Sequence, residues 1–277
     1  MNRRQLLAGG AAAAAVGPAW SLGVEPRWVE VTRHPLPGAA APLRIVQLTD
    51  VHLRSVHPAA RAVAAALDAE PPDLLVLTGD IVESPAALPE LTAWLADLRF
   101  GQAVATLGNW EHWGDVSRMA LEAAYARAGV ALLVDEAQRL ALPGGPWSVV
   151  GLDDAVARPD PVAAWRDAAR DGPQLLLAHS PGDLRRIASA IAAAGVRAPA
   201  LSLSGHTHGG QVRVPGVPPV LPPHSGRFVA GWYDAGGWPA YVSRGVGTSV
   251  VPARFACRPE VACFSAPGPL AAAAGAG

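Results

Sequence analysis

PDLLVLTGD, residues 72–80, says more about the fold of this chain than any other stretch. A short apolar run between Pro and Gly-Asp is typical of a buried strand, and it places Asp80 at the carboxyl end of that strand. LRIVQLTD, residues 43–50, has the same form and ends at Asp50, and QAVATLGN, residues 102–109, ends at Asn109. Three buried strands that each end in an oxygen-bearing side chain indicate a sheet with one polar edge.

Helices are predicted between these strands and further along the chain, because Ala- and Leu-rich stretches alternate with the apolar runs. The expected helices cover residues 59–70, 87–99, 117–129, 160–170 and 182–195. The later expected strands cover residues 131–135, 139–143, 147–154, 173–181, 199–208, 210–215, 226–233, 240–248 and 260–265. Strands that first alternate with helices and then follow one another predict an α/β fold: a four-layer α/β/β/α sandwich of two mixed β-sheets flanked by helices. We expect residues 26–270 to form one domain and residues 271–277 a disordered tail.

The N-terminus, MNRRQLLAGGAAAAAVGPAW, has paired arginines, Arg3 and Arg4, followed by a mildly apolar stretch. This pattern favours a twin-arginine export signal over residues 1–25, either cleaved or kept as an anchor. The alternative is an ordinary first helix. The apolar run is short and rich in Ala and Gly for a membrane span. Export predicts a periplasmic or envelope-associated protein, with possible membrane association through the N-terminus.

Composition gives no electrostatic argument for nucleic-acid binding. Charged residues make up 16% of the chain and the net charge is −1, so nothing in the charge favours nucleic-acid binding. The cysteines, Cys257 and Cys263, could form a disulfide in an exported protein or could both be small core residues. Neither belongs to a cluster with metal-ligand spacing.

Seven polar residues follow the predicted strands, and the carboxyl ends of strands in an open α/β sheet are where ligands bind. They are Asp50, His52, Asp80, Asn109, His179, His206 and His208. In DVH and HTH the two polar residues lie two apart, so on an extended chain both point to the same side. Nitrogen and oxygen ligands of this kind suit Mn, Fe or Zn. Seven ligands exceed the needs of one ion and suit two divalent ions that share one carboxylate.

The order of these motifs resembles the calcineurin-like metallophosphoesterase superfamily. The motifs are D-x-H, G-D, G-N-x-E, an apolar strand followed by His, and G-H-T-H-G-G-Q. The twin-arginine start and the stretch YVSRGVGTSVVPARFACRPEV, residues 241–261, are similar to the bacterial exported phosphodiesterase branch. The resemblance extends over about residues 43–265.

The resemblance implies a dinuclear phosphoesterase that hydrolyses phosphodiester or pyrophosphate bonds by in-line attack of a metal-bridging hydroxide. Asp50, His52 and His208 would bind one ion. Asn109, His179 and His206 would bind the other, and Asp80 would bridge the two. The substrate would be a phosphorylated small molecule or a lipid-linked pyrophosphate. A metal-binding module with little turnover is the alternative.

Trp110 marks a departure from the superfamily, which commonly has His after the motif Asn. An indole cannot donate the proton that such a His would supply. Three interpretations follow: His112 supplies the imidazole from the same side of an extended loop, the metals stabilise the leaving group alone, or turnover is low. We therefore count His112 with Asp80 and Asn109 as catalytic candidates.

Other polar and aromatic residues have weaker indications. Arg54 either reaches the substrate or is solvated, and Trp110 and Trp113 could line the substrate entrance. Asp153 and Asp154 either orient a ligand His or cap a turn. For Arg244 and Arg254 we expect structural ion pairs, for His57 and His224 surface positions, and for Trp147, Trp165, Trp232 and Trp238 positions in the core or at its rim.

Overall fold

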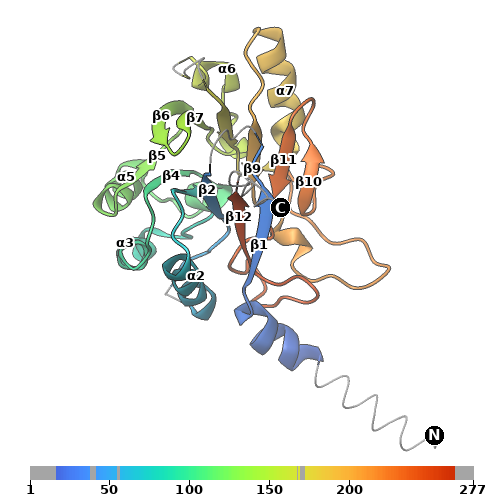
Figure 1. Ribbon diagram of the computed structural model, residues 1–277. Helices are drawn as coiled ribbons and strands as arrows, with labels where there is room; N and C mark the ends of the chain where they lie inside the picture. The colour runs from blue at the N-terminus through green and yellow to red at the C-terminus, as the bar shows by residue number, and fades with distance from the viewer. Residues whose placement is uncertain (1–16, 38–41, 55–56, 167, 169–171, 266–277) are drawn as a thin grey trace, which may run out of the picture.

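The computed structural model describes residues 17–37, 42–54, 57–166, 168 and 172–265. Its strands form two six-stranded mixed sheets (Figure 1). The first sheet has the order β1 (Glu30–Pro35), β12 (Glu260–Ser265), β2 (Arg44–Leu48), β3 (Leu74–Thr78), β4 (Gln102–Thr106), β5 (Val130–Leu132). The second has the order β10 (Gly231–Asp234), β11 (Pro239–Val242), β9 (Leu201–Ser204), β8 (Gln174–Leu177), β7 (Gly145–Gly151), β6 (Glu136–Leu142).

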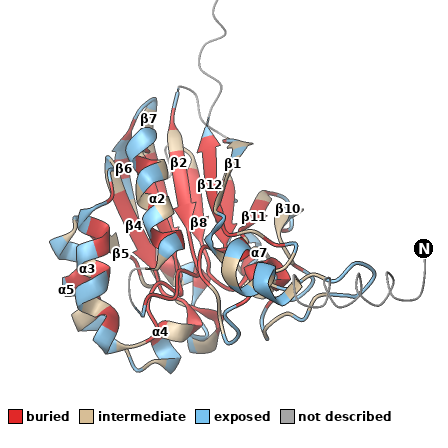
Figure 2. Ribbon diagram, turned by 90° about the horizontal axis from the view of Figure 1, so that it is seen from below, coloured by how far each residue is buried: buried red, intermediate tan, exposed pale blue. Residues whose placement is uncertain are grey.

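Helices cover the outer face of each sheet, which gives the four layers that the sequence predicts. The α-helices are α2 (Pro58–Ala69), α3 (Leu88–Ala96), α4 (Asn109–Trp113), α5 (Arg118–Arg127), α6 (Pro161–Ala164) and α7 (Leu184–Ala193). Buried side chains of α2, α3 and α5 pack on the first sheet, and those of α6 and α7 pack on the second. A third apolar cluster lies between the sheets. Buried residues accordingly run along the strands, while the outer faces of the helices are exposed (Figure 2).

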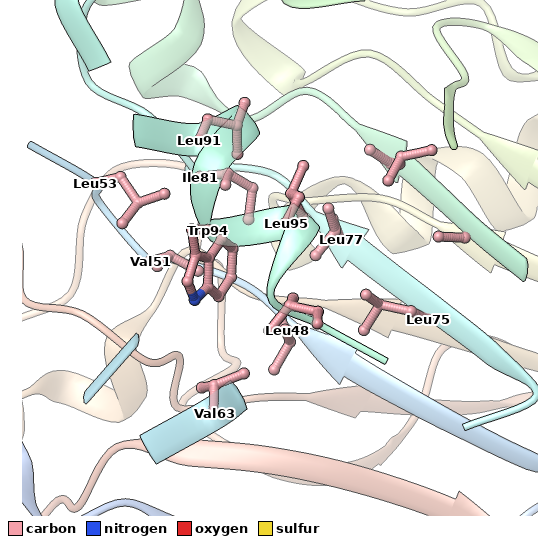
Figure 3. Packing of buried hydrophobic residues seen from close by; sticks show 14 of the residues in the cluster. Leu48, Val51, Leu53, Val63, Leu75, Leu77, Ile81, Leu91, Trp94 and Leu95 are labelled. Carbon is pink, nitrogen blue, oxygen red and sulfur yellow. The ribbon is translucent and has the colours of Figure 1, made fainter. Parts of the chain in front are cut away.

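Side chains along a central strand alternate between two apolar clusters, one under the helices and one between the sheets. In β3, Leu75 and Leu77 join the cluster under the helices, whereas Leu74 and Val76 join the cluster between the sheets. Successive side chains of a strand point to opposite faces, so a strand buried on both faces is apolar along most of its length. Trp94 of α3 lies near Leu48 and Val63 (Figure 3), and its indole nitrogen donates to the Ala60 carbonyl at 3.0 Å.

The structure differs from the predicted elements at several points. Strand β1 was not predicted, and it pairs in parallel with β12 at the other end of the chain. Residues 210–215 form only an isolated bridge, Val212 to Phe255, and no strand. The helix expected over residues 160–170 ends as α6 at Ala164, although Asp160 caps it as expected by accepting from Val162 and Ala163. The predicted tail, residues 271–277, and residues 1–16 of the predicted export signal lie outside the described residues. No helix in the described part of the chain is long and apolar enough to cross a membrane.

Candidate metal centre

All seven predicted ligands lie at the same edge of the sandwich, on the segments that follow β2, β3, β4, β8 and β9. Strands β2, β3 and β4 run parallel, as do β8 and β9, so each set ends on one side. Each of the seven side chains is buried, with exposed fractions from 0% for Asp50 and His179 to 6% for His208. The sequence prediction that these strand ends converge is therefore confirmed.

Asp50, His52 and His208 form the first group. The two imidazole Nε2 atoms lie 3.0 Å apart, and His208 Nε2 lies 3.4 Å from Asp50 Oδ1. The ligand atoms of the three residues all lie within 4.8 Å of one another. Three ligand atoms at these distances could hold one divalent ion.

Asp80, His179 and His206 form a second group with the same spacing. Asn109 belongs with it, because its Oδ1 lies 2.7 Å from His206 Nδ1 and 3.3 Å from His179 Nε2. Carboxylate, amide oxygen and imidazole nitrogen together form a ligand set that suits a borderline divalent metal.

Asp80 lies between the two groups. Its Oδ2 is 3.2 Å from His179 Nε2 and 3.9 Å from His52 Nε2. Its other oxygen, Oδ1, accepts from the Trp110 backbone N–H at 2.8 Å. One oxygen is thus fixed by the backbone, while the other faces ligands of both groups.

Each imidazole has two ring nitrogens. A hydrogen bond made by one of them leaves the other available to a metal. His179 Nδ1 donates to the Thr78 carbonyl at 2.7 Å, which leaves Nε2 facing Asp80. His206 Nε2 donates to the Pro223 carbonyl at 2.5 Å, which leaves Nδ1 facing Asn109. His52 Nδ1 lies 3.1 Å from Glu83 Oε1, and neither atom has another hydrogen-bond partner among the described residues. These residues fit two divalent ions, because ring nitrogens and carboxylate oxygens of each group converge within 4.8 Å of one another in a buried space.

The backbone of the site is strained, and here one sequence argument was wrong. Asp50, His52, Asp80, His206 and His208 have φ between 49° and 70°. Side chains rarely adopt this left-handed region, and such residues cluster at functional sites. DVH and HTH are therefore not extended, so their paired polar residues meet through left-handed turns and not through strand alternation.

Burial and mutual charge shift the pKa values of the ligands in different directions. Burial raises the pKa of the Asp50 carboxyl. Burial opposes ionisation of Asp80 as well, but His179, His52 and the Trp110 N–H together hold the pKa of Asp80 below its usual value. Burial, the neighbouring His52 and Arg254 hold the pKa of His208 well below its usual value. His208 thus stays neutral, the form in which imidazole binds metals.

Glu111 connects the segments that follow β3 and β4 through backbone hydrogen bonds. Its carboxylate accepts from the backbone N–H groups of Gly108, Asp80, Ile81 and Val82 at 2.7 to 3.1 Å. Glu111 thus ties the segment after β3 to the start of α4. A Cβ on Gly108 would lie 2.3 Å from Asp80 Oδ1, which explains why glycine precedes Asn109.

Comparison with known proteins agrees with this geometry, since residues 43–210 match the family described as calcineurin-like phosphoesterase. The chain belongs to that family. It is 32% identical to phosphodiesterase YaeI of Escherichia coli over 86% of this chain and 88% of the relative. It is 29% identical to metallophosphoesterase YkuE of Bacillus subtilis over 96% and 97% of the two chains. A phosphopantetheinyl hydrolase of Mycobacterium tuberculosis shows a weaker structural likeness, with a TM-score of 0.45 and 17% identity over 78% and 96% of the chains. The chain is thus a metallophosphoesterase, a hydrolase of phosphoric ester bonds.

Trp110 of this phosphoesterase packs against the metal ligands. Its ring meets the His52 ring edge-on, with centroids 5.7 Å apart, and meets Trp113 at 5.8 Å. The two indoles therefore form an edge-to-face series that begins at His52, and Trp113 is exposed. Their predicted role in lining the substrate entrance stays a prediction.

His112 lies in a helix, so the expectation of an extended loop around it was wrong. Within α4, residues three apart share a face, which puts His112 on the side of Asn109. His112 Nε2 lies 2.6 Å from Asp153 Oδ1, and this contact raises the pKa of the imidazole. Asp154 caps the following turn through Val156 N–H and accepts from Ser180, the neighbour of His179.

Other sequence expectations have mixed outcomes. Arg54 pairs with Glu83, the residue that faces His52. The sequence does not predict a role for Glu83, because an acidic residue in an irregular stretch belongs to no motif with a recognisable spacing. Arg244 pairs with Glu30 and Glu260 as expected. Arg254 does not fit its expected ion pair: it is buried and donates to the carbonyls of Arg244, Gly245, Gly247 and Cys257.

The remaining expectations concern cysteine, histidine and tryptophan positions. Cys257 and Cys263 are both buried and free, as the core interpretation predicts. His224 is exposed, whereas His57 is half-buried and caps α2 by accepting from Ala60 N–H. Trp147, Trp165 and Trp238 are buried, and Trp232 lies at the rim with 38% exposed.

Proposed function

We propose that this metallophosphoesterase uses two divalent ions, of Mn, Fe or Zn, to hydrolyse phosphodiester or pyrophosphate bonds. The observation that carries the proposal is the position of Asp80 Oδ2, which faces His52 of the first ligand group and His179 of the second. A shared carboxylate of this kind is how two ions come to act on one phosphoryl group.

The protein's own residues would hold the ions and keep the site rigid. Both oxygens of Asp50 accept from His206 N–H at 3.0 Å, and Oδ2 also accepts from Thr49 Oγ1 at 2.9 Å. These contacts fix the carboxylate before any ion binds. The ions, when bound, would supply a water of lowered pKa and the positive charge that stabilises in-line displacement at phosphorus.

For protonation of the leaving group, we propose His112 as the donor. The raised pKa of His112 keeps its imidazole protonated at higher pH, and its position on the Asn109 side of α4 supports this role. Asp153 would orient the ring. Departure of the leaving group with help from the metals alone is the alternative.

Preference for diesters is supported by the relative named phosphodiesterase YaeI, which is 32% identical to this chain. Export through residues 1–25 to the periplasm or envelope remains our proposal, on the paired arginines Arg3 and Arg4. With export, a lipid-linked pyrophosphate is the second candidate substrate.

Turnover of bis(p-nitrophenyl) phosphate with added Mn²⁺ tests the function. We expect activity that falls by at least about 10²-fold in Asp80→Ala and His208→Ala, because each removes a ligand without touching the core. The matched control is Asp97→Ala, at the C-terminus of α3. A wild-type protein that binds two ions per chain but turns over no faster than Asp80→Ala is a metal-binding module, and the proposal is then wrong.

A further inference from the structure

Exposed apolar side chains of this protein gather on three segments that we call the apolar rim: residues 17–28, 211–228 and 247–258. Of the 14 large apolar side chains exposed in the described part of the chain, ten lie there. They are Trp20, Leu22, Val24, Trp28, Val212, Val214, Val217, Val220, Val250 and Val251. Single exposed apolar residues are ordinary, but a contiguous group marks an interaction surface.

Hydrogen bonds join the three segments into one surface. Arg254 N–H donates to the Ser21 carbonyl at 2.8 Å, which fixes the N-terminal segment to the last one. Arg213 N–H donates to the Phe255 carbonyl at 2.8 Å, and Gln211 Nε2 donates to the Val251 carbonyl at 2.7 Å. In Figure 1 the three segments lie together on the lower side of the molecule, away from α5.

The exposed charged residues of the apolar rim are all basic. Glu25 is its one acidic residue, and this side chain is 3% exposed because its carboxylate accepts from Trp20 Nε1 and Cys257 N–H. Arg27 and Arg227 are exposed, and Arg213 and Arg258 are half-exposed. The surface therefore combines valines and tryptophans with positive charge, which suits the boundary between anionic headgroups and acyl chains.

We propose that the apolar rim binds the surface of an anionic lipid bilayer. A second observation favours lipid as the occupant: the rim follows directly on the apolar sequence LLAGGAAAAAV, residues 6–16. Trp20 and Trp28 are the residue type that concentrates at membrane–water boundaries. The contact is peripheral and extends over two loops far from the N-terminus in sequence.

The rim also adjoins the metal centre. A cavity of about 290 Å³ is lined by Leu22, Arg27 and Pro252 of the rim and by His52 and Arg54 of the centre. A membrane bound at the rim therefore lies next to the cavity that borders His52. The binding itself does not depend on the proposed function, because it can be measured without turnover.

Co-sedimentation of the full chain with vesicles tests the proposal. Vesicles of phosphatidylcholine with phosphatidylglycerol are compared with vesicles of phosphatidylcholine alone. We expect binding to the anionic vesicles that weakens at high salt, and that falls about tenfold for each of Val220→Asp and Val250→Asp. Both side chains are largely exposed, at 91% and 86%, and Val250 has a φ of 62°, which Asp tolerates better than Val.

The matched control is Met119→Asp, which places the same charge on a side chain that is 78% exposed on α5. This variant should bind as wild type does. Equal melting temperatures for all three variants and the wild type establish that folding is unchanged. Wild-type protein that stays in the supernatant with both kinds of vesicle contradicts the proposal. Val220→Asp and Val250→Asp proteins that both sediment as wild type does contradict it too, since the lipid contact then lies outside the rim.

Discussion

At the scale of single residues, Glu83 contacts a candidate metal ligand, His52, without belonging to either ligand group. Its Oε1 lies 3.1 Å from His52 Nδ1, while Arg54 holds the other carboxylate oxygen. A carboxylate behind a ligand imidazole fixes the ring and raises its basicity. The same residue links the predicted substrate contact Arg54 to the first ligand group.

We expect Glu83→Gln to weaken binding of the first ion about 10–100-fold, because the ring of His52 loses its charged partner. Mn²⁺ titration followed by calorimetry measures the change. Glu122→Gln, on the exposed face of α5, is the matched control. Unchanged Mn²⁺ affinity in Glu83→Gln would show that His52 is oriented by other contacts.

His112 should make stability depend on pH. Its pKa is raised by the hydrogen bond to Asp153, so the pair stabilises the fold fully below the unfolded pKa of about 6.5 and loses this effect as pH rises through the folded value. The ring is 33% exposed, so we expect His112→Gln to cost no more than about 1 kcal/mol at pH 6 and less at pH 9. Urea unfolding at both pH values measures this. A cost that is equal at both, or larger at pH 9, contradicts the assignment.

The residue types of the site could be predicted from sequence, but their conformations could not. Asp50, His52, Asp80, His206 and His208 have positive φ, which only the packed strand ends can impose. For the same reason the partners of the outer imidazole nitrogens, such as Pro223 for His206, are invisible in the sequence. These hydrogen-bond partners depend on which loops fold over the site.

At the scale of elements, α4 and the segment after β3 form one unit through Glu111. Four backbone N–H groups from these segments converge on this carboxylate. Burial and the nearby Asp80 raise the pKa of the Glu111 carboxyl, while the N–H donors oppose that shift. The carboxylate thus replaces hydrogen bonds that neither the strand ends nor the helix start can make internally.

Glu111→Gln should destabilise the protein by about 2–4 kcal/mol, because an amide NH₂ would face backbone donors in a buried space. Thermal unfolding in the presence of a chelator separates this effect from metal binding. Glu136→Gln, an exposed position in β6, is the control. If Glu111→Gln melts as wild type does, the strand ends are held by other interactions.

The sequence predicts best the elements with a clear pattern of apolar residues. Examples are α7, with helical spacing, and β3, with a continuous apolar run. Strand β1 was missed because none of its residues is fully buried, so the strand has no apolar run and shows no clear alternation. The turn of α4 was missed because GNWEHW has two bulky indoles and no apolar period. Tertiary contacts from Glu111 and Asp80 decide its conformation.

At the scale of the whole molecule, the two sheets bring the ligands of both groups to a single edge. The sequence predicted the four layers, since alternating and consecutive strands leave few arrangements. The strand order could not be predicted, because β1 and β12 pair across more than 220 residues of chain, from Glu30 to Glu260. The pairing of β1 with β12 also brings residues 17–28 against residues 247–258 and completes the apolar rim.

Anomalous diffraction from crystals grown with Mn²⁺ tests whether Asp80 bridges two ions. We expect two anomalous peaks roughly 3.5–4 Å apart, with Asp80 between them. One peak should contact Asp50, His52 and His208, and the other Asn109, His179 and His206. A single peak, or two peaks of which only one contacts Asp80, would show that Asp80 does not bridge two ions.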